Sequence, residues 1–413
     1  MKKYRLIGVL LLGSTLFIGC GNSSSNHSVK SELLLEMSSK EIKDTLRSAG
    51  WTDFGDSKMY GYKAYKISYV TKDENNKEVN ASGLFVIPTE VDEKIKEDGF
   101  SLVSYGHGTL TLNDNAPSVY TEKEKDPIVS AIIFSSFGGF ATLQADYIGY
   151  GDSQKQIHTY IMKKSLANAS IDFINAVKKF AKRENIKLNK KLFITGYSEG
   201  GYTAMATLQE LEKRGTPVTA TAPLAGDFNL NDSADIIFKL KDKNIIASTY
   251  SRTYLSLATL AYTKIYNKNI ESIIKKPYAK KMDKLFDGKH SFEQIEKSLP
   301  TYISGEEGLV RDEFIDDYYQ NENNWFKKAL KKNNVDNWKA KTPIHIFHCE
   351  GDDQSSYETA QKTYNQMIEN GSTQVELITL DAEQADNEKW NHDECELPAL
   401  LSSFLWFREI RDE

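Results

Sequence analysis

The sequence has no cluster of basic residues. Its net charge is −6, and its lysine pairs are short and lie among polar and apolar residues, at Lys275-Lys276, Lys327-Lys328 and Lys331-Lys332. Such pairs are typical of solvated helix faces. Binding to nucleic acid needs many cations on one face to neutralise the phosphates, so we predict no nucleic acid partner.

Long apolar runs and internal repeats are also missing. Residues 6–18 are apolar, but a run this short cannot cross a bilayer as a helix of the mature protein. The hydrophobic content of 40% is enough for a sizeable core in a chain of 413 residues. We therefore expect one large domain with an insertion, or two domains.

Cysteine is scarce, with only three in the chain. The first, Cys20, follows a positively charged start, the apolar residues 6–18 and Gly19. This stretch resembles the lipobox of bacterial lipoproteins, in which a small residue precedes an obligate cysteine. The resemblance implies a signal peptide over residues 1–19, cleavage after Gly19, and a lipid attached to Cys20.

The lipobox determines where we expect the protein to be. Residues 20–30 are rich in serine and asparagine, which is typical of a flexible tether. We predict an exported, monomeric lipoprotein that the lipid at Cys20 anchors to a bacterial membrane, on the periplasmic or cell-surface side. Outside the cytoplasm the other two cysteines, Cys349 and Cys395, can form a disulfide.

Beyond the tether the sequence alternates between strand and helix patterns. Strands are predicted over residues 60–70, 79–88, 100–105, 140–145, 192–195, 218–222, 342–348 and 374–380, and helices over 31–47, 127–136, 165–184 and 396–408. The first two strands form a hairpin. Strands that alternate with helices predict a mostly parallel α/β sheet flanked by helices.

Between residues 228 and 339 the pattern changes. No strand-like run occurs there, and segments such as 234–240, 254–266 and 314–331 have helical periodicity. We interpret residues 228–339 as a helical insertion between two core strands. The core then has two parts, residues 31–227 and residues 340–413.

Residues 192–206 carry the clearest chemical motif. An apolar run ends in Gly196-Tyr197-Ser198-Glu199-Gly200, and a helix-forming run follows at once. In the order strand, sharp turn, helix, the pattern Gly-x-Ser-x-Gly is a nucleophile elbow, which exposes the serine at the tip of the turn. Ser198 is therefore the candidate nucleophile.

A serine nucleophile needs a base, and the base needs an orienting carboxylate. In elbow hydrolases the chain order is serine, acid, histidine. Asp352 and Asp353 both follow a predicted strand and are candidate acids, with Asp352 preferred. His392 is the one histidine after them and is the candidate base. His345 and His348 precede the acid, so we interpret them as packing or loop-support residues.

The developing oxyanion needs two backbone N–H donors. Glu199, at the start of the elbow helix, is expected to supply one. The loop Tyr105-Gly106-His107-Gly108-Thr109 follows the third core strand and is expected to supply the other, from Thr109 or alternatively from Gly108. His107 precedes the serine, so we assign it to loop structure and not to the base.

At these motifs the sequence resembles α/β-hydrolases of the secretory lipase family, including their bacterial lipase and esterase relatives. The matching segments are 105–109, 145–153, 196–201, 222–226 and 348–352, within about residues 60 to 410. The resemblance implies an α/β-hydrolase fold, esterase or lipase activity without metal or cofactor, and a cap over the pocket formed by residues 228–339. Asp146, in the second segment, is interpreted as structural.

The two remaining cysteines flank the candidate acid and base. Cys349 lies three residues before Asp352, and Cys395 lies three residues after His392. In a formed triad the loops of the acid and the base are neighbours. We therefore hypothesise a Cys349–Cys395 disulfide that clamps them together, with two free thiols as the alternative.

The leading functional hypothesis is hydrolysis of a carboxylic ester through an acyl-serine intermediate, on a small-molecule, lipid or acylated-sugar substrate. One alternative is a serine exopeptidase of the same fold, in which acids of the insertion would bind a free amine; the candidates are Glu306, Glu307, Asp312 and Glu313. Another is a non-catalytic surface lipoprotein that uses the fold for binding.

Overall fold

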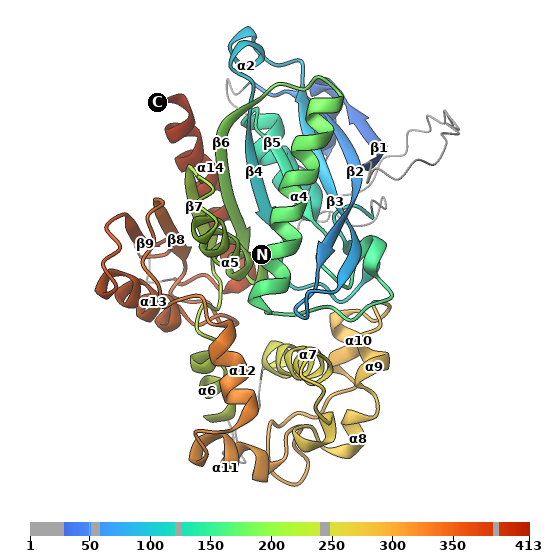
Figure 1. Cartoon of the computed structure of the whole chain (residues 1–413), viewed down its shortest axis with the longest axis vertical. Helices are drawn as coiled ribbons and strands as arrows, with labels where there is room; N and C mark the ends of the chain where they lie inside the picture. Colours follow the sequence, from blue (N-terminus) through green and yellow to red (C-terminus); the bar gives the residue numbers. More distant parts are fainter. Residues whose placement is uncertain (1–28, 49, 51–57, 120–125, 240–247, 383–387) are drawn as a thin grey trace.

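The computed structural model describes residues 29–48, 50, 58–119, 126–239, 248–382 and 388–413 (Figure 1). The predicted signal peptide, Cys20 and most of the predicted tether lie outside these residues. None of the described helices is both long enough and apolar enough to cross a membrane.

One nine-stranded sheet runs through the described core, in the order β1-β2-β3-β5-β4-β6-β7-β8-β9. Its strands are β1 (Lys30–Met37), β2 (Gly61–Lys72), β3 (Glu78–Thr89), β4 (Phe100–Gly106), β5 (Ala141–Ala145), β6 (Leu188–Tyr197), β7 (Ala220–Leu224), β8 (Ile344–His348) and β9 (Val375–Thr379). β1, β2, β3 and β5 pair antiparallel, and all pairings from β5 onward to β9 are parallel. The mostly parallel sheet expected from the sequence is confirmed.

Local sequence explains the hairpin of β2 and β3. The Asp73 side chain accepts the backbone N–H groups of Asn75 at 2.9 Å and Lys77 at 2.8 Å. Asn76 has a φ of 64°, a left-handed conformation that asparagine tolerates better than most residues. The turn therefore sets the register in which the two strands pair.

Helices cover both faces of the sheet (Figure 1). On one face lie α4 (Lys163–Arg183) and α5 (Glu199–Lys213), and on the other lie α14 (His392–Asp412) and the π-helical segment η2 (Ile132–Phe137), which continues α3 (Asp126–Ala131). α13 (Tyr357–Glu369) packs on β8 and β9. The shorter elements are α1 (Ser39–Ser48), α2 (Glu93–Asp98), η1 (Asn113–Asn115) and η3 (Gly151–Ser153).

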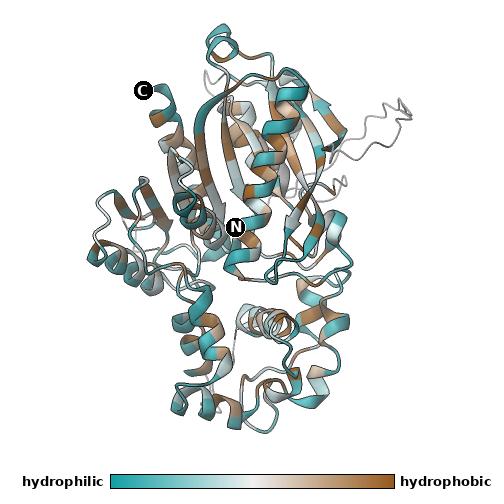
Figure 2. Ribbon diagram, in the orientation of Figure 1, coloured by the Kyte–Doolittle hydropathy of each residue, from teal (hydrophilic) through white to brown (hydrophobic). Residues whose placement is uncertain are grey.

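The two faces of β6 belong to two different apolar cores. Leu192 and Ile194 pack in the core beneath α4 and α5. Phe193 points to the other face, where its ring lies 4.8 Å from that of Phe407 of α14. Side chains of a strand alternate between faces, so a continuous apolar run is what a strand buried on both sides requires. Figure 2 shows brown and white stretches along the central strands that lie behind α4.

Between β7 and β8 the chain forms a helical layer below the sheet in Figure 1. Its helices are α6 (Leu230–Lys239), α7 (Thr249–Ile265), η4 (Ile270–Ser272), α8 (Lys276–Ala279), α9 (Met282–Leu285), α10 (Phe292–Glu296), α11 (Asp312–Gln320) and α12 (Trp325–Asn333). The described residues of the layer contain an isolated bridge between Ile274 and Val310 but no longer strand. The insertion begins at the carboxyl end of β7, and it therefore lies near the carboxyl ends of the parallel strands.

The prediction of one helix over residues 31–47 is wrong in its first half. That half is β1, which pairs antiparallel with β2. The helix α1 begins only after Ser38, which forms a capping box with Glu41: each residue's backbone N–H donates to the other's side chain, at 2.8 and 3.3 Å. Pairing with β2 outweighs the local helix propensity, because the edge of β2 offers a row of unpaired backbone groups.

Candidate active site

Ser198 lies at the sharp turn between β6 and α5. Its backbone has φ 57° and ψ −118°, a strained conformation for a residue other than glycine. Its N–H donates to Leu224 of the neighbouring strand β7 at 2.9 Å. The strand, the helix and β7 together therefore hold the turn in a conformation that the chain would not adopt alone, as a nucleophile elbow requires.

Glycines allow this turn to pack against the end of β4. A Cβ atom placed on Gly200 would lie 2.0 Å from the carbonyl oxygen of Gly106, and one on Gly196 would lie 2.6 Å from the same oxygen. Both contacts are far too short for carbon and oxygen. The two glycines of Gly-x-Ser-x-Gly are therefore required so that strand and helix can approach one another.

His392 and Asp352 meet beside the elbow. His392 Nδ1 lies 2.7 Å from Asp352 Oδ2, and both side chains are buried. The other oxygen, Asp352 Oδ1, accepts the backbone N–H groups of Gln354 at 2.9 Å and Ser355 at 2.8 Å. Asp353 instead accepts the backbone N–H of His392 at 3.2 Å. Of the two candidate acids, Asp352 is the one that contacts the imidazole.

The imidazole is brought to the elbow by Tyr197, the residue before Ser198. The Tyr197 hydroxyl donates to the His392 carbonyl oxygen at 2.6 Å, and the two rings lie 4.8 Å apart. His392 was expected in a loop, but it is the first residue of α14, which begins four residues earlier than predicted. A capping box between Asn391 and Glu394 starts the helix there.

The acid and the base shift each other's pKa. Burial raises the pKa of Asp352, but hydrogen bonds from His348 and His392, with the charge of these imidazoles, outweigh it and hold the pKa well below its usual range. Burial lowers the pKa of His392, but the hydrogen bond to Asp352 and its charge outweigh it, so the pKa is raised. A base with a raised pKa accepts the serine proton more readily.

His348 contacts the acid Asp352 directly, in addition to packing at the end of β8. Its Nε2 lies 3.2 Å from Asp352 Oδ2 and 2.9 Å from the carbonyl oxygen of Ser355. A carbonyl can only accept, so Nε2 carries a hydrogen and His348 supports the carboxylate from behind. His345 does pack, because its ring stacks on Trp406 at 3.7 Å.

The loop after β4 lies against the nucleophile. A Cβ atom built on Gly108 would be 3.7 Å from the Cβ of Ser198. Gly108, the alternative oxyanion donor, therefore lies next to Ser198, and the expected donor Thr109 is the residue after it. The other expected donor, Glu199, is the first residue of α5, where backbone N–H groups lack intrahelical partners.

Comparison with known proteins supports this architecture. A model of the prolyl oligopeptidase family matches residues 130–253, which include the elbow but less than half of the chain. No curated protein sequence matches the chain.

Solved structures match over nearly the whole chain. A Legionella pneumophila protein described as a hydrolase has a TM-score of 0.80 and 22% identity, covering 93% of this chain and 98% of its own. The rice cell wall degrading esterase LipA from Xanthomonas oryzae has a TM-score of 0.76 and 23% identity, covering 94% of this chain and 98% of its own. Candida antarctica lipase A in its closed state has a TM-score of 0.65 and 14% identity, covering 93% of this chain and 81% of its own.

The chain has the α/β-hydrolase fold. In open sheets of this kind, ligands bind at the carboxyl ends of the parallel strands. The elbow follows β6, the Asp352 loop follows β8 and the Gly108 loop follows β4, so these three segments meet at one edge of the sheet. Tertiary pairing thus brings together residues more than two hundred positions apart in the chain.

Sequence reasoning did not single out His158, which lies beside the elbow of this α/β-hydrolase fold. Its Nε2 lies 2.7 Å from Glu199 Oε1, its Nδ1 lies 2.8 Å from the Ile148 carbonyl oxygen, and both side chains are buried. Because that carbonyl only accepts, Nδ1 carries a hydrogen. The signal was Glu199 itself, since a carboxylate in a buried segment needs a partner.

His107 connects the Gly108–Thr109 segment to the loop that contains Asp146 and Ile148. Its Nε2 lies 3.2 Å from the Asp146 carbonyl oxygen, while His158 reaches Ile148 two residues further on. The Asp146 carboxylate is buried and accepts the Ser118 N–H at 2.7 Å and the Ser82 hydroxyl at 2.5 Å. The loop from Asp146 therefore contacts both arms of the predicted oxyanion site, in agreement with a structural role for Asp146.

A cavity of about 280 Å³ lies between the core of the α/β-hydrolase fold and its insertion. Tyr160, Asp227, Asp352, Asp353 and Gln354 form its core side. The insertion lines the other side with α6, α7 and α12, mainly through apolar side chains, at Leu230, Ala234, Ile236, Ile237, Tyr254, Leu255, Ala258, Phe326 and Leu330. Among the described residues, no group of three or more His, Cys, Asp or Glu is arranged to hold a metal ion.

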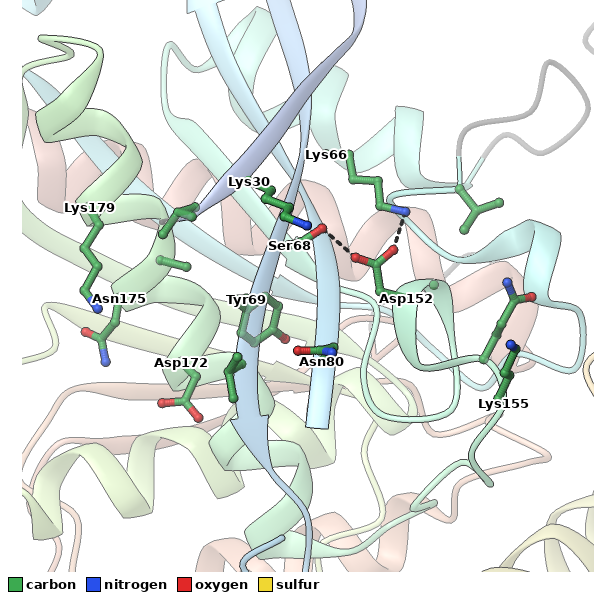
Figure 3. A pocket seen from close by; sticks show the side chains of 16 residues that line it. Lys30, Lys66, Ser68, Tyr69, Asn80, Asp152, Lys155, Asp172, Asn175 and Lys179 are labelled. Carbon is green, nitrogen blue, oxygen red and sulfur yellow. Dashed lines mark hydrogen bonds and ion pairs between the residues drawn. The ribbon is translucent and has the colours of Figure 1, made fainter. Parts of the chain in front are cut away.

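A second hollow, of about 980 Å³, lies at the other end of the sheet between β2 and α4 (Figure 3). Its side chains are mostly polar, and the Lys66 ammonium and the Ser68 hydroxyl both bind Asp152, at 2.6 and 2.5 Å. β2 is separated from the elbow strand β6 by three strands. This hollow is therefore distinct from the candidate active site.

The hypothesised Cys349–Cys395 disulfide is present, and both residues are fully buried. It joins the end of β8 to the first turn of α14, so it closes a loop that contains Asp352 and His392. The sequence separation is 46 residues. A cross-link of that length stabilises the folded state by about 4 kcal/mol in the chain-entropy model.

Replacing both cysteines with alanine is expected to lower the melting temperature by about 5 °C, because about 4 kcal/mol is lost from a chain of this size. Differential scanning calorimetry measures the shift. The matched control is wild type whose disulfide has been reduced in the unfolded state. Two free thiols in the unfolded wild type without reductant would contradict the disulfide.

Proposed function

We propose that the chain is a serine hydrolase that cleaves carboxylic esters through an acyl-serine intermediate. The observation that carries the proposal is the buried 2.7 Å contact of His392 with Asp352, held by Tyr197 next to the strained turn at Ser198. A serine placed at an elbow, a base beside it and an acid behind the base are the three parts that nucleophilic acyl transfer requires.

The proposed reaction has two halves. His392 Nε2 takes the proton of Ser198 Oγ while Oγ attacks the ester carbonyl, and the N–H groups of Glu199 and Thr109 bind the oxyanion. The C–O bond to the alcohol then breaks, and the alcohol leaves with the proton from His392. Water attacks the acyl-serine with His392 again as base, which releases the acid and restores Ser198.

The comparisons support ester hydrolysis over the alternatives. LipA is described as an esterase and the Candida antarctica protein as a lipase, so esters are the substrates that the similar structures name. The prolyl oligopeptidase match keeps a serine peptidase as the second candidate. The insertion acids first considered for amine binding do not support it, because Glu306, Glu307, Asp312 and Glu313 are exposed and lie outside the cavity.

Fatty acyl esters and aminoacyl anilides distinguish the candidates. We expect p-nitrophenyl acetate and octanoate to be hydrolysed, and aminoacyl p-nitroanilides to be poor substrates, because an anilide leaving group needs more assistance than a phenolate. A fluorophosphonate probe should form an adduct at Ser198. No adduct and no turnover would favour the non-catalytic binding protein, and turnover of anilides alone would favour the peptidase.

We also propose that the hydrolase is attached to a membrane by a lipid on Cys20. The lipobox and the disulfide support this, since stable disulfides are typical of exported proteins. Replacing Cys20 with alanine should block labelling with radioactive palmitate and release the protein from the membrane fraction. Labelling that persists in the variant would contradict the proposal.

A further inference from the structure

Asp227 follows the strand that lies between those preceding the nucleophile and the acid. It is the third residue after the end of β7, and β7 lies between β6 and β8 in the sheet. Ser198 donates its N–H to Leu224 at the end of that same strand at 2.9 Å. A carboxylate at this position is at the edge of the sheet where the candidate active site forms.

Two hydroxyl groups hold Asp227 by one oxygen only. Ser233 Oγ lies 3.0 Å and Ser355 Oγ 3.1 Å from Asp227 Oδ1. No described residue donates a hydrogen bond to Oδ2, and Asp227 lines the cavity. The carboxylate is therefore fixed in orientation, while one of its oxygens keeps its lone pairs for a ligand.

The described residues that line the cavity supply no positive charge to this carboxylate. These residues include Asp227, Asp352 and Asp353 but no lysine, arginine or histidine. Asp352 already has His392 and His348 as partners. Burial raises the pKa of Asp227, the two serine hydrogen bonds lower it, and the Asp352 charge raises it further. The charge of His348, which does not line the cavity, lowers it, but the pKa is raised overall. Asp227 is half-buried, and a cation that enters the cavity can pair with Oδ2 and offset part of the cost of desolvating the carboxylate.

We propose that Asp227 is a substrate-binding residue that pairs with a protonated amine of the substrate, so that the hydrolase prefers esters that carry an ammonium group. The inference rests on the proposed ester hydrolysis and adds the chemical class of the substrate to it. The apolar side chains of α6, α7 and α12 on the opposite wall hold the hydrocarbon part that carries the amine.

Matched ester pairs test the preference at pH 7. One pair places the amine on the acyl part, as the p-nitrophenyl esters of 6-aminohexanoate and hexanoate. The other places it on the alcohol part, as 2-aminoethyl and ethyl hexanoate. We expect wild type to have a kcat/KM roughly 10- to 100-fold higher for the amine-bearing member of at least one pair, and Asp227→Asn to abolish that ratio by slowing the amine-bearing member.

Asp232→Asn is the matched control. Asp232 lies on α6 next to Ser233, but it pairs with Lys362 and does not line the cavity. This variant should keep the wild-type ratio. A wild type without preference in either pair would overturn the inference. So would an Asp227→Asn variant that loses activity equally on both members, because Asp227 would then act on the acid loop through Ser355.

A binding measurement separates this inference from the proposed function. Calorimetry compares hexylammonium and 1-hexanol on wild type and Asp227→Asn without any turnover. Binding of hexylammonium that the variant weakens at least 10-fold, with 1-hexanol unaffected, supports the inference even if no ester is cleaved. Equal affinity of the variant and wild type for hexylammonium, or no binding to wild type, overturns it even if esters are cleaved.

Discussion

Replacing Ser198 with alanine is expected to reduce ester hydrolysis by at least about 10⁴-fold, because no other group at the elbow can form the acyl intermediate. The fold should survive, since alanine removes only a half-buried hydroxyl, and the strained backbone is held by β6, β7 and α5. Initial rates with p-nitrophenyl acetate measure the effect, and circular dichroism checks the fold.

The control for Ser198 is another serine on the surface of the same chain. Ser298 lies in the insertion, where its hydroxyl donates to the Gln294 carbonyl oxygen at 2.9 Å. Ser298→Ala should keep full activity and full labelling by a fluorophosphonate probe, while Ser198→Ala should lose both. Turnover in Ser198→Ala close to that of wild type would eliminate the proposed nucleophile.

Replacing Asp352 with asparagine is expected to lower kcat by roughly 10³- to 10⁴-fold. The carboxylate accepts from His392 Nδ1 and balances the charge of the imidazolium, whereas an amide can present a donor to Nδ1 and favour the wrong tautomer. Asp353→Asn is the matched control, because Asp353 contacts only the backbone N–H of His392 among its described hydrogen bonds. We expect a loss of less than about 10-fold for it.

The pH profile gives a second measure of the same pair. Hydrolysis requires neutral His392, so activity falls as the pH drops through the raised pKa of this imidazole. In Asp352→Asn the stabilising charge is absent, so the inflection should move to lower pH. In Asp353→Asn it should stay near the wild-type position. An equal shift in both variants would contradict the assignment of Asp352 as the acid.

Much of the core could be predicted because its signals are local. The apolar runs of β4, β6 and β8 are strands buried on both faces, and the turn at Asp73 and Asn76 sets the first hairpin. The prediction for residues 31–37 was wrong because their partner, β2, is not a local neighbour in sequence. Pairing with the open edge of β2 outweighed the helical propensity of the leucine and glutamate residues in β1.

The candidate site divides in the same way. The chain order of Ser198, Asp352 and His392 could be read from sequence, and so could the spacing of Cys349 and Cys395 around the last two. The His158–Glu199 contact could not, because its two residues belong to segments whose approach depends on how α4 and α5 pack on the sheet. The same holds for Asp227, whose neighbour Ser233 lies in the first helix of the insertion and whose neighbour Ser355 follows the insertion.

The sequence by itself determined the elbow, the alternation of strands and helices, and the order of the residues proposed for catalysis, because each depends on neighbours within a few positions. The tertiary structure decided that Asp352 contacts the imidazole of His392 while Asp353 contacts only its backbone N–H, because in such a tight turn adjacent side chains point in different directions. It also decided that a carboxylate with no positively charged partner among the described lining residues faces the cavity, since only the pairing of β7 between β6 and β8 brings Asp227 there.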